Sequence, residues 1–153
     1  PWVNPYSAYD VEVSHRFARA GDQVVDPTAG KGGLIFGANA DFTTIFVVEW
    51  NFEGSCSVNK YPGRSAPLSS SAIPRTIYRD WGRCTSVKVG YDQVNTAKVT
   101  VIGNSATVYI NGTQVASFTD SQLGSMHRVG ILSGSWDRTP VEGRFDDFRV
   151  TAR

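Results

Sequence analysis

Two short stretches of the sequence place a tryptophan beside an aspartate and arginines. Trp81 lies in the run Arg-Asp-Trp-Gly-Arg over 79–83, and Trp136 lies in Ser-Trp-Asp-Arg over 135–138. An indole face can pack against the C–H groups of a sugar ring, and planar carboxylate and guanidinium groups can bind its hydroxyls. We therefore predict ligand contacts at these loop-like positions, namely Tyr78, Trp81, Arg83, Trp136, Asp137 and Arg138. The alternative is that both tryptophans cap the ends of a core and that the charged residues form surface pairs.

A second candidate for chemistry is the run Glu-Trp-Asn-Phe-Glu over 49–53. Side chains alternate between the two faces of a strand, so that Glu49, Asn51 and Glu53 would share one face. The alternative is two solvated carboxylates at the end of a strand. Gly54 follows at once, which favours a position for Glu53 in a turn.

Cys56 and Cys84 are the two cysteines of the chain. In an exported protein they predict one disulfide bond, which stabilises by about 3 kcal/mol. Two free thiols in a cytosolic protein are the alternative. Neither cysteine lies in a Cys-x-x-Cys motif, and His15 and His127 are far apart in sequence, so that no zinc site of the usual spacing is present. We expect a secreted or cell-surface location. The sequence begins at Pro1, which indicates a processed form or part of a longer chain.

The composition indicates an all-β protein. A length of 153 residues predicts a single domain over 1–153. Valine and isoleucine together number 25 against 4 leucines, and β-branched side chains suit a pleated sheet. The formal net charge of +1 argues against nucleic acid and anionic membrane surfaces as partners. No apolar run approaches the length of a membrane span.

Turn signals separate short stretches of alternating polarity along the chain. The clearest unit is a hairpin in which Asn111-Gly112 joins strands over 106–110 and 113–118. Further strands are predicted over 9–19, 34–38, 43–51, 57–61, 75–78, 86–91, 97–102, 129–132 and 145–150. Residues 62–74 are predicted to form a long surface loop and residues 1–8 an extended N-terminal segment. We expect almost no helix beyond one turn within 120–125.

The order of these motifs resembles the concanavalin-like, laminin G-like β-sandwich superfamily. The resemblance covers about 9–151 and is carried by the stretches Val-Thr-Val-Ile-Gly-Asn over 99–104, the hairpin over 107–115, Arg-Val-Gly-Ile over 128–131 and Arg-Phe-Asp-Asp-Phe-Arg-Val over 144–150. It is strongest for the bacterial branch found with carbohydrate-active enzymes and secreted proteins. The resemblance implies a jelly roll of two antiparallel sheets, a fold that hosts lectins, carbohydrate-binding modules, adhesion domains and glycoside hydrolases.

Within this superfamily the run over 49–53 is similar to the Glu-x-Asp-x-Glu strand of laminarinase-type retaining hydrolases. By that resemblance Glu49 matches the nucleophile and Glu53 the acid/base. Asn51 replaces the central carboxylate, and the chain is shorter than that family usually is. We therefore expect no catalysis. The resemblance also implies a possible calcium ion, with candidate ligands Asp22, Asp26, Asp146 and Asp147, although no loop of calcium-binding spacing occurs.

The sequence thus predicts a non-catalytic extracellular module that recognises a glycan or glycoprotein and requires no cofactor. The competing hypothesis is a self-associating structural or adhesive subunit. In that case the apolar segment that contains Trp2 and Tyr6 adds a strand to a neighbouring copy. Alternatively, the same segment folds back on its own sandwich.

Overall fold

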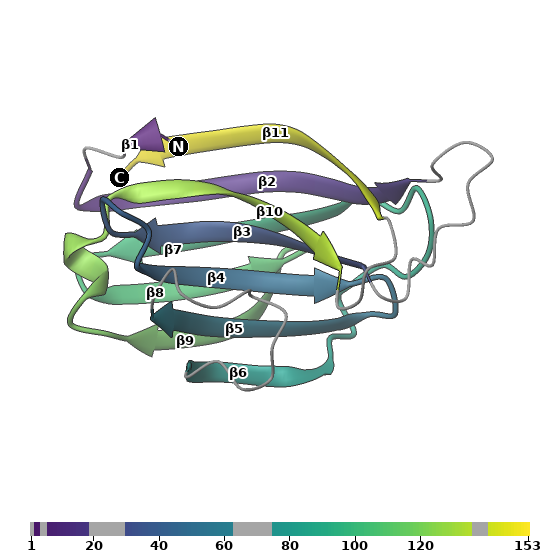
Figure 1. Ribbon diagram of the computed structural model, residues 1–153, viewed down its shortest axis with the longest axis horizontal. Helices are drawn as coiled ribbons and strands as arrows, with labels where there is room; N and C mark the ends of the chain where they lie inside the picture. The colour runs from purple at the N-terminus through teal and green to yellow at the C-terminus, as the bar shows by residue number, and fades with distance from the viewer. Residues whose placement is uncertain (1, 4–5, 19–29, 63–74, 136–140) are drawn as a thin grey trace.

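The computed structural model describes residues 2–3, 6–18, 30–62, 75–135 and 141–153. Its strands form two antiparallel sheets that face each other (Figure 1). Sheet A has the order β1 (Trp2–Val3), β10 (Arg128–Ser135), β3 (Gly30–Ala38), β4 (Thr44–Asn51), β5 (Ser55–Pro62) and β6 (Thr76–Arg83). Sheet B has the order β11 (Glu142–Ala152), β2 (Ala8–Ala18), β7 (Asn95–Ile102), β8 (Ser105–Ile110) and β9 (Thr113–Thr119). This arrangement confirms the predicted all-β sandwich.

Local sequence signals account for much of sheet B. Asn111 and Gly112 have φ values of 50° and 79°, as a tight hairpin turn between β8 and β9 requires. The alternation predicted over 9–19 is present as β2, whose side chains are buried at every second position. The single helical turn is the 3-10 segment Leu123–Ser125. In the described part of the chain, no helix is long and apolar enough to cross a membrane.

Several predicted strand positions are wrong. No strand forms over 86–91, where Gly90 and Asp92 have positive φ and the Asn95 side chain bonds to both the N–H and the C=O of Lys88. Strand β3 begins at Gly30, before its predicted start at residue 34. Strand β6 continues to Arg83, beyond its predicted end at residue 78. The predicted loop over 62–74 lies outside the described residues after residue 62.

The N-terminal strand pairs within its own chain. Trp2 lies opposite Val129 and Val3 opposite Arg128, so that β1 extends the edge of sheet A beside β10. This is the fold-back arrangement, in which the segment pairs with its own sandwich.

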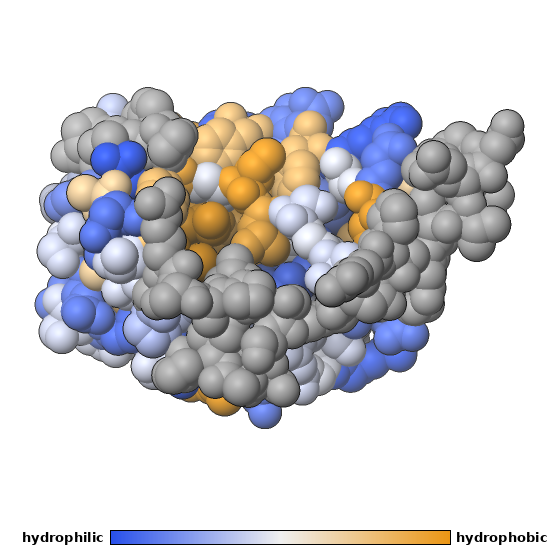
Figure 2. Space-filling view, viewed as in Figure 1, coloured by the Kyte–Doolittle hydropathy of each residue, from blue (hydrophilic) through white to orange (hydrophobic). Residues whose placement is uncertain are grey.

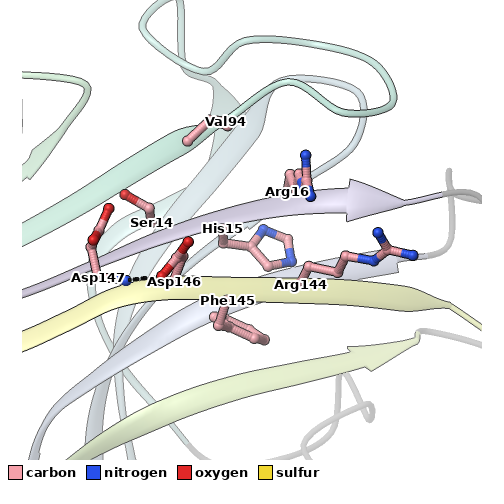
Figure 3. A pocket seen from close by; sticks show the side chains of 8 residues that line it. All are labelled: Ser14, His15, Arg16, Val94, Arg144, Phe145, Asp146 and Asp147. Atoms are coloured by element: carbon pink, nitrogen blue, oxygen red, sulfur yellow. Dashed lines mark hydrogen bonds between the residues drawn. The ribbon is translucent and has the colours of Figure 1, made fainter.

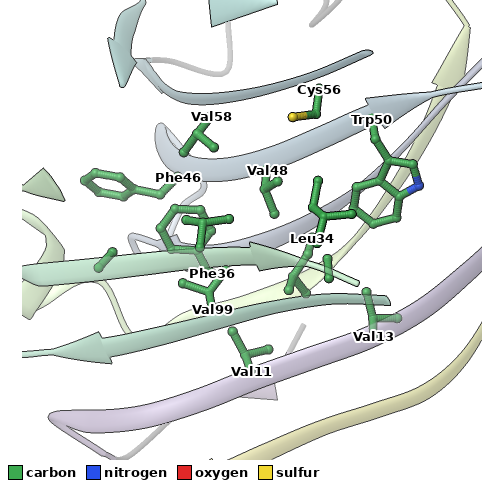
Figure 4. Packing of buried hydrophobic residues seen from close by; sticks show 14 of the residues in the cluster. Val11, Val13, Leu34, Phe36, Phe46, Val48, Trp50, Cys56, Val58 and Val99 are labelled. Carbon is green, nitrogen blue, oxygen red and sulfur yellow. The ribbon is translucent and has the colours of Figure 1, made fainter. Parts of the chain in front are cut away.

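The core lies between the sheets and is filled by alternate side chains of the central strands (Figure 4). Val11 and Val13 of β2 and Val99 of β7 pack against sheet A. Trp50 of β4 is 0% exposed and belongs to this core. A second, smaller cluster lies on the outer face of sheet A and contains Ala38, Ile45, Val47 and Tyr61.

One core position is occupied by a histidine. His15 is 1% exposed, and its ring lies 4.6 Å from those of Phe17 and Phe145 between centroids. A Cβ atom at Gly32 or Gly143 would lie 2.5 or 2.7 Å from the His15 ring, so that only glycine permits the close approach of both strands. Neither ring nitrogen has a hydrogen-bond partner among the described residues. Burial lowers the pKa of His15 from 6.5 to about 4, since the charged ring would lose its hydration.

We expect acid to weaken the fold through His15. As the pH falls from 7 to 4, His15 takes up a proton in the unfolded chain at its ordinary pKa of 6.5, but in the folded chain only near pH 4. Protonation therefore favours the unfolded chain and lowers the unfolding free energy by about 3 kcal/mol over this range. The His15→Phe variant should lack this loss and be more stable at pH 7, because no unbonded ring nitrogen is then buried. Urea denaturation of both proteins at pH 7, 5.5 and 4 provides the measurement.

The comparison isolates His15 because other acid effects are shared by the two proteins. The pKa values of Asp10 and Asp120 are lowered from 3.8, so that the stability these carboxylates contribute is lost only as the pH falls below that value. Parallel pH profiles for wild type and His15→Phe would contradict the prediction.

Candidate functional site

Trp81 lies on the edge strand β6 rather than in a loop. Two irregularities interrupt the pairing of β6 with β5, and one of them sets Asp80 and Trp81 opposite the single residue Ser57. Such bulges change the direction in which side chains leave an edge strand. The Asp80 carboxylate accepts a hydrogen bond from the backbone N–H of Trp81 at 2.9 Å, which fixes the bulge locally. Trp81 is half-buried and its indole Nε1 lies in the buried part, while Asp80 and Arg83, which flank it in sequence, are exposed.

A disulfide bond holds the end of this strand. Cys56 of β5 is joined to Cys84, the residue that follows β6, and this confirms the predicted pairing across 28 positions. Arg79 adds two contacts, from its Nε to the Cys56 Sγ at 3.2 Å and from its Nη2 to the backbone oxygen of Arg83 at 3.0 Å. We refer to Arg79, Asp80, Trp81 and Arg83 as the β6 ledge.

A chain of polar contacts crosses the outer face of sheet A towards the ledge. Lys31 Nζ on β3 lies 2.7 Å from Glu49 Oε1 on β4, and the Tyr61 hydroxyl on β5 donates to Glu49 Oε2 at 3.0 Å. Further along this face, Arg75 Nη2 lies 3.6 Å from Asp80 Oδ1 on β6. Burial, and next the Glu49 carboxylate, raise the pKa of Tyr61, whereas Arg75 acts in the opposite direction. The same face carries an apolar patch beside these polar groups (Figure 2).

The interpretation of Glu49 and Glu53 as two solvated carboxylates is wrong for Glu49. Glu49 is 0% exposed and paired with Lys31, which is 2% exposed. Glu53 is exposed in the turn after β4, as Gly54 predicted, and so does not share a strand face with Glu49. Asn51 stabilises this turn by accepting a hydrogen bond from the N–H of Ser55 at 2.8 Å. The geometry of a retaining glycosidase pair is therefore not formed by these residues.

Tyr78 points away from the ledge and into the sandwich. Its ring stacks on Phe118 of β9, with centroids 3.7 Å apart, and its hydroxyl donates to Asp120. Lys60 also bonds to Asp120, at 2.5 Å. Burial alone would raise the pKa of Asp120, but the hydrogen bonds from Lys60 and Tyr78 lower it below its ordinary value. Since the ring of Tyr78 is committed to packing, the β6 ledge does not include it.

The other residues predicted to bind a ligand or a calcium ion do not belong to the β6 ledge. Trp136, Asp137 and Arg138 fall outside the described residues, as do the calcium candidates Asp22 and Asp26. Asp146 and Asp147 are adjacent and exposed on β11, and the N–H of Asp147 donates to Asp146 at 2.9 Å. The described residues contain no group of three His, Cys, Asp or Glu side chains placed to hold a metal ion.

A cavity of about 580 Å³ opens on the outer face of sheet B (Figure 3). Register places Arg16 of β2 directly opposite Arg144 of β11, and Ser14 opposite Asp146. The two arginines and two aspartates, Asp146 and Asp147, balance in charge, and the cavity is completed by Ser14, His15, Val94 and Phe145. Sequence reasoning identified only the two aspartates of this cavity. The arginine pair could be found only from the strand register, because its members are far apart in the chain.

No protein-family model matches the chain, and no curated protein matches it in sequence. Solved structures do match in shape. A carbohydrate-binding module, CBM66 from Bacillus subtilis, superposes with a TM-score of 0.68 over 95% of this chain and 75% of its own, at 11% identity. The chain has the concanavalin-like sandwich fold.

Both a lectin and an enzyme share this fold with the chain. Sheep galectin-11 matches with a TM-score of 0.58 at 15% identity, over 99% of this chain and all of its own. The alginate lyase A1-II′ matches with a TM-score of 0.62 at 10% identity, over 99% of this chain and 64% of its own. At these identities the likeness concerns the fold alone, and the fold does not decide the function.

We expect the Glu49→Gln variant to lose about 3–5 kcal/mol of unfolding free energy, because Lys31 would remain buried without its counter-charge. Replacing both residues, as in Lys31→Met with Glu49→Leu, should cost less than the single change, since no charge then remains buried. Urea denaturation of the three proteins is the measurement. A loss below about 1 kcal/mol for Glu49→Gln, the range of an exposed pair, would show that the pair is solvated.

The disulfide bond should stabilise both the fold and the β6 ledge. Removing it in Cys56→Ala/Cys84→Ala is expected to cost about 3–4 kcal/mol, the loop-closure value for the 28-residue separation. Hydrogen exchange of the β6 amides should rise more than that of β8, which lies in the other sheet. An equal rise in both strands would mean that the bond does not hold the ledge locally.

Proposed function

We propose that this domain is a non-catalytic carbohydrate-recognition module and that it binds its glycan at the β6 ledge. The observation that carries the proposal is the partly exposed indole of Trp81, set on a bulged edge strand between the exposed side chains of Asp80 and Arg83. Trp50, by contrast, is 0% exposed and serves the core.

The chemistry of the ledge suits a sugar ring. An indole offers a flat apolar face, and a carboxylate and a guanidinium offer an acceptor and planar donors for ring hydroxyls. The disulfide bond beside the ledge and the bonds of Arg79 hold these groups before a ligand arrives. Less conformational entropy is then lost when the ligand binds.

The structural neighbours support the same class of function. One is described as a carbohydrate-binding module and others are galectins, although an alginate lyase has the same fold. The state of Glu49 favours a non-catalytic domain, because its carboxylate is committed to Lys31 and Tyr61. A disulfide bond persists in oxidising compartments, which supports a secreted or cell-surface module whose partner is a glycan or glycoprotein.

The proposal predicts that Trp81→Ala abolishes or greatly weakens glycan binding without unfolding the domain. Loss of a central aromatic contact is expected to reduce affinity by at least about tenfold. A glycan array of the purified domain, run in calcium and again in EDTA, identifies the ligand, and titration calorimetry then compares the variants. Binding that disappears in EDTA would place a calcium ion in the contact.

Phe148→Ala is the matched control, because Phe148 is a 42% exposed aromatic side chain on β11 in the other sheet. The control should bind as the wild type does, and all three proteins should show the same unfolding midpoint. Silence of the folded domain on a broad array would overturn the proposal and favour the self-associating subunit. Equal affinity of Trp81→Ala and wild type would move the site away from the ledge.

A further inference from the structure

The charged groups around the β6 ledge do not balance. Glu49 is neutralised by Lys31 at 2.7 Å, and Asp80 is paired with Arg75 at 3.6 Å. Arg79 and Arg83 then remain without any carboxylate partner in the described part of the chain. Two uncompensated guanidinium groups thus lie within two residues of Trp81, in a protein whose formal net charge is only +1.

The geometry keeps both guanidinium groups available. Among the described residues, Arg79 uses its Nε and Nη2 for contacts with the Cys56 sulfur and the Arg83 carbonyl. A guanidinium has five N–H donors, so that others remain for a ligand. The Arg83 side chain is exposed, and it has no hydrogen bond or ion pair with the described residues. The hydrogen bond from Arg79 Nη2 to the backbone oxygen of Arg83 fixes the position of the Arg79 guanidinium relative to the end of β6.

We infer that the glycan taken by the β6 ledge is anionic, with a carboxylate or sulfate group that binds Arg79 and Arg83 while a sugar ring packs on Trp81. This inference rests on the proposed function and adds its substrate class. A guanidinium binds carboxylate and sulfate oxygens through two parallel hydrogen bonds, which an ammonium cannot do. Within the described part of the chain the Asp80 carboxylate of the ledge is paired with Arg75, so that an anionic group of the ligand would be the first ion-pair partner of Arg79 and Arg83.

Other features of the molecule fit an anionic glycan less well. The cavity on sheet B contains two arginines, but Asp146 and Asp147 line the same space and cancel their charge. Charged side chains on an edge strand can also serve only to prevent pairing with another chain. If Arg83 has only that role, replacing it should lower the solubility of the domain and leave ligand affinity unchanged. If Arg83 binds an anionic glycan, replacing it should lower the affinity.

The experiment uses two pairs of polymers that differ only in charge. Polygalacturonate is compared with its carboxyl-reduced neutral form, and dextran sulfate is compared with dextran. We expect the wild-type domain to bind at least one charged polymer about tenfold or more tightly than its neutral form, with an affinity that falls as salt is raised. Preference for polygalacturonate would identify a carboxylate, and preference for dextran sulfate a sulfate, as the recognised group.

Three variants assign the preference to the ledge. Arg83→Gln should reduce it by about tenfold, and Arg83→Lys should restore only part of it, because an ammonium lacks the two-pronged geometry. Lys88→Gln is the matched control, since it removes an exposed positive charge outside β6 and should leave the preference unchanged. Aggregation of Arg83→Gln with unchanged affinity would overturn the inference in favour of edge protection.

The outcomes separate the inference from the proposed function. Equal binding of charged and neutral polymers, still lost in Trp81→Ala, would overturn the anionic class and leave glycan recognition in place. Tight binding of every polyanion that Trp81→Ala does not weaken would also overturn the inference, because it would reflect charge alone. No binding to any of the four polymers would overturn the inference for carboxylate and sulfate polymers. The array then decides the proposed function separately.

Discussion

The outer face of sheet A depends on the contact between the Lys31 ammonium and the Glu49 carboxylate, because both charges are buried. Neither group could occupy its position alone, since an isolated buried charge costs several kcal/mol. The Tyr61 hydroxyl satisfies the second carboxylate oxygen and thereby ties β5 to β3 and β4. This contact determines what is left for recognition. It commits Glu49 to an ion pair, whereas Arg79 and Arg83 on β6 have no carboxylate partner in the described part of the chain.

The sequence predicts those parts of the fold that follow from local periodicity. The alternation of β2 and the turn at Asn111-Gly112 need only neighbouring residues, and both are as expected. The partner of Glu49 could not be predicted, because Lys31 lies on another strand and meets it only through the register of β3 with β4. The start of β3 was not predicted for the same reason, because Gly32 is required by its close approach to the His15 ring of another strand.

The candidate site shows the same division between local and long-range information. The local sequence over 79–83 identified Trp81 and Arg83, since an aromatic residue beside charged planar groups can be recognised from neighbouring residues alone. The sequence did not reveal that the indole lies on a bulged edge strand, because a bulge is defined by the partner strand β5. Tyr78 carries the same local signal, yet it turns towards Phe118 of the opposite sheet. Single residues thus indicated the kind of chemistry, and strand pairing decided which of them can take part.

The stacking of Tyr78 on Phe118 has a mechanical consequence. It joins the edge strand of one sheet to the edge strand of the other, and Lys60 and Asp120 reinforce the same seam. The disulfide bond anchors the far end of β6 at Cys84. A long polymer under tension, attached at Trp81, would pull on a strand that is held on one side by the Tyr78–Phe118 contact and on the other by the disulfide bond. The force would then be shared between the two sheets as shear, and β6 would not peel away from its end.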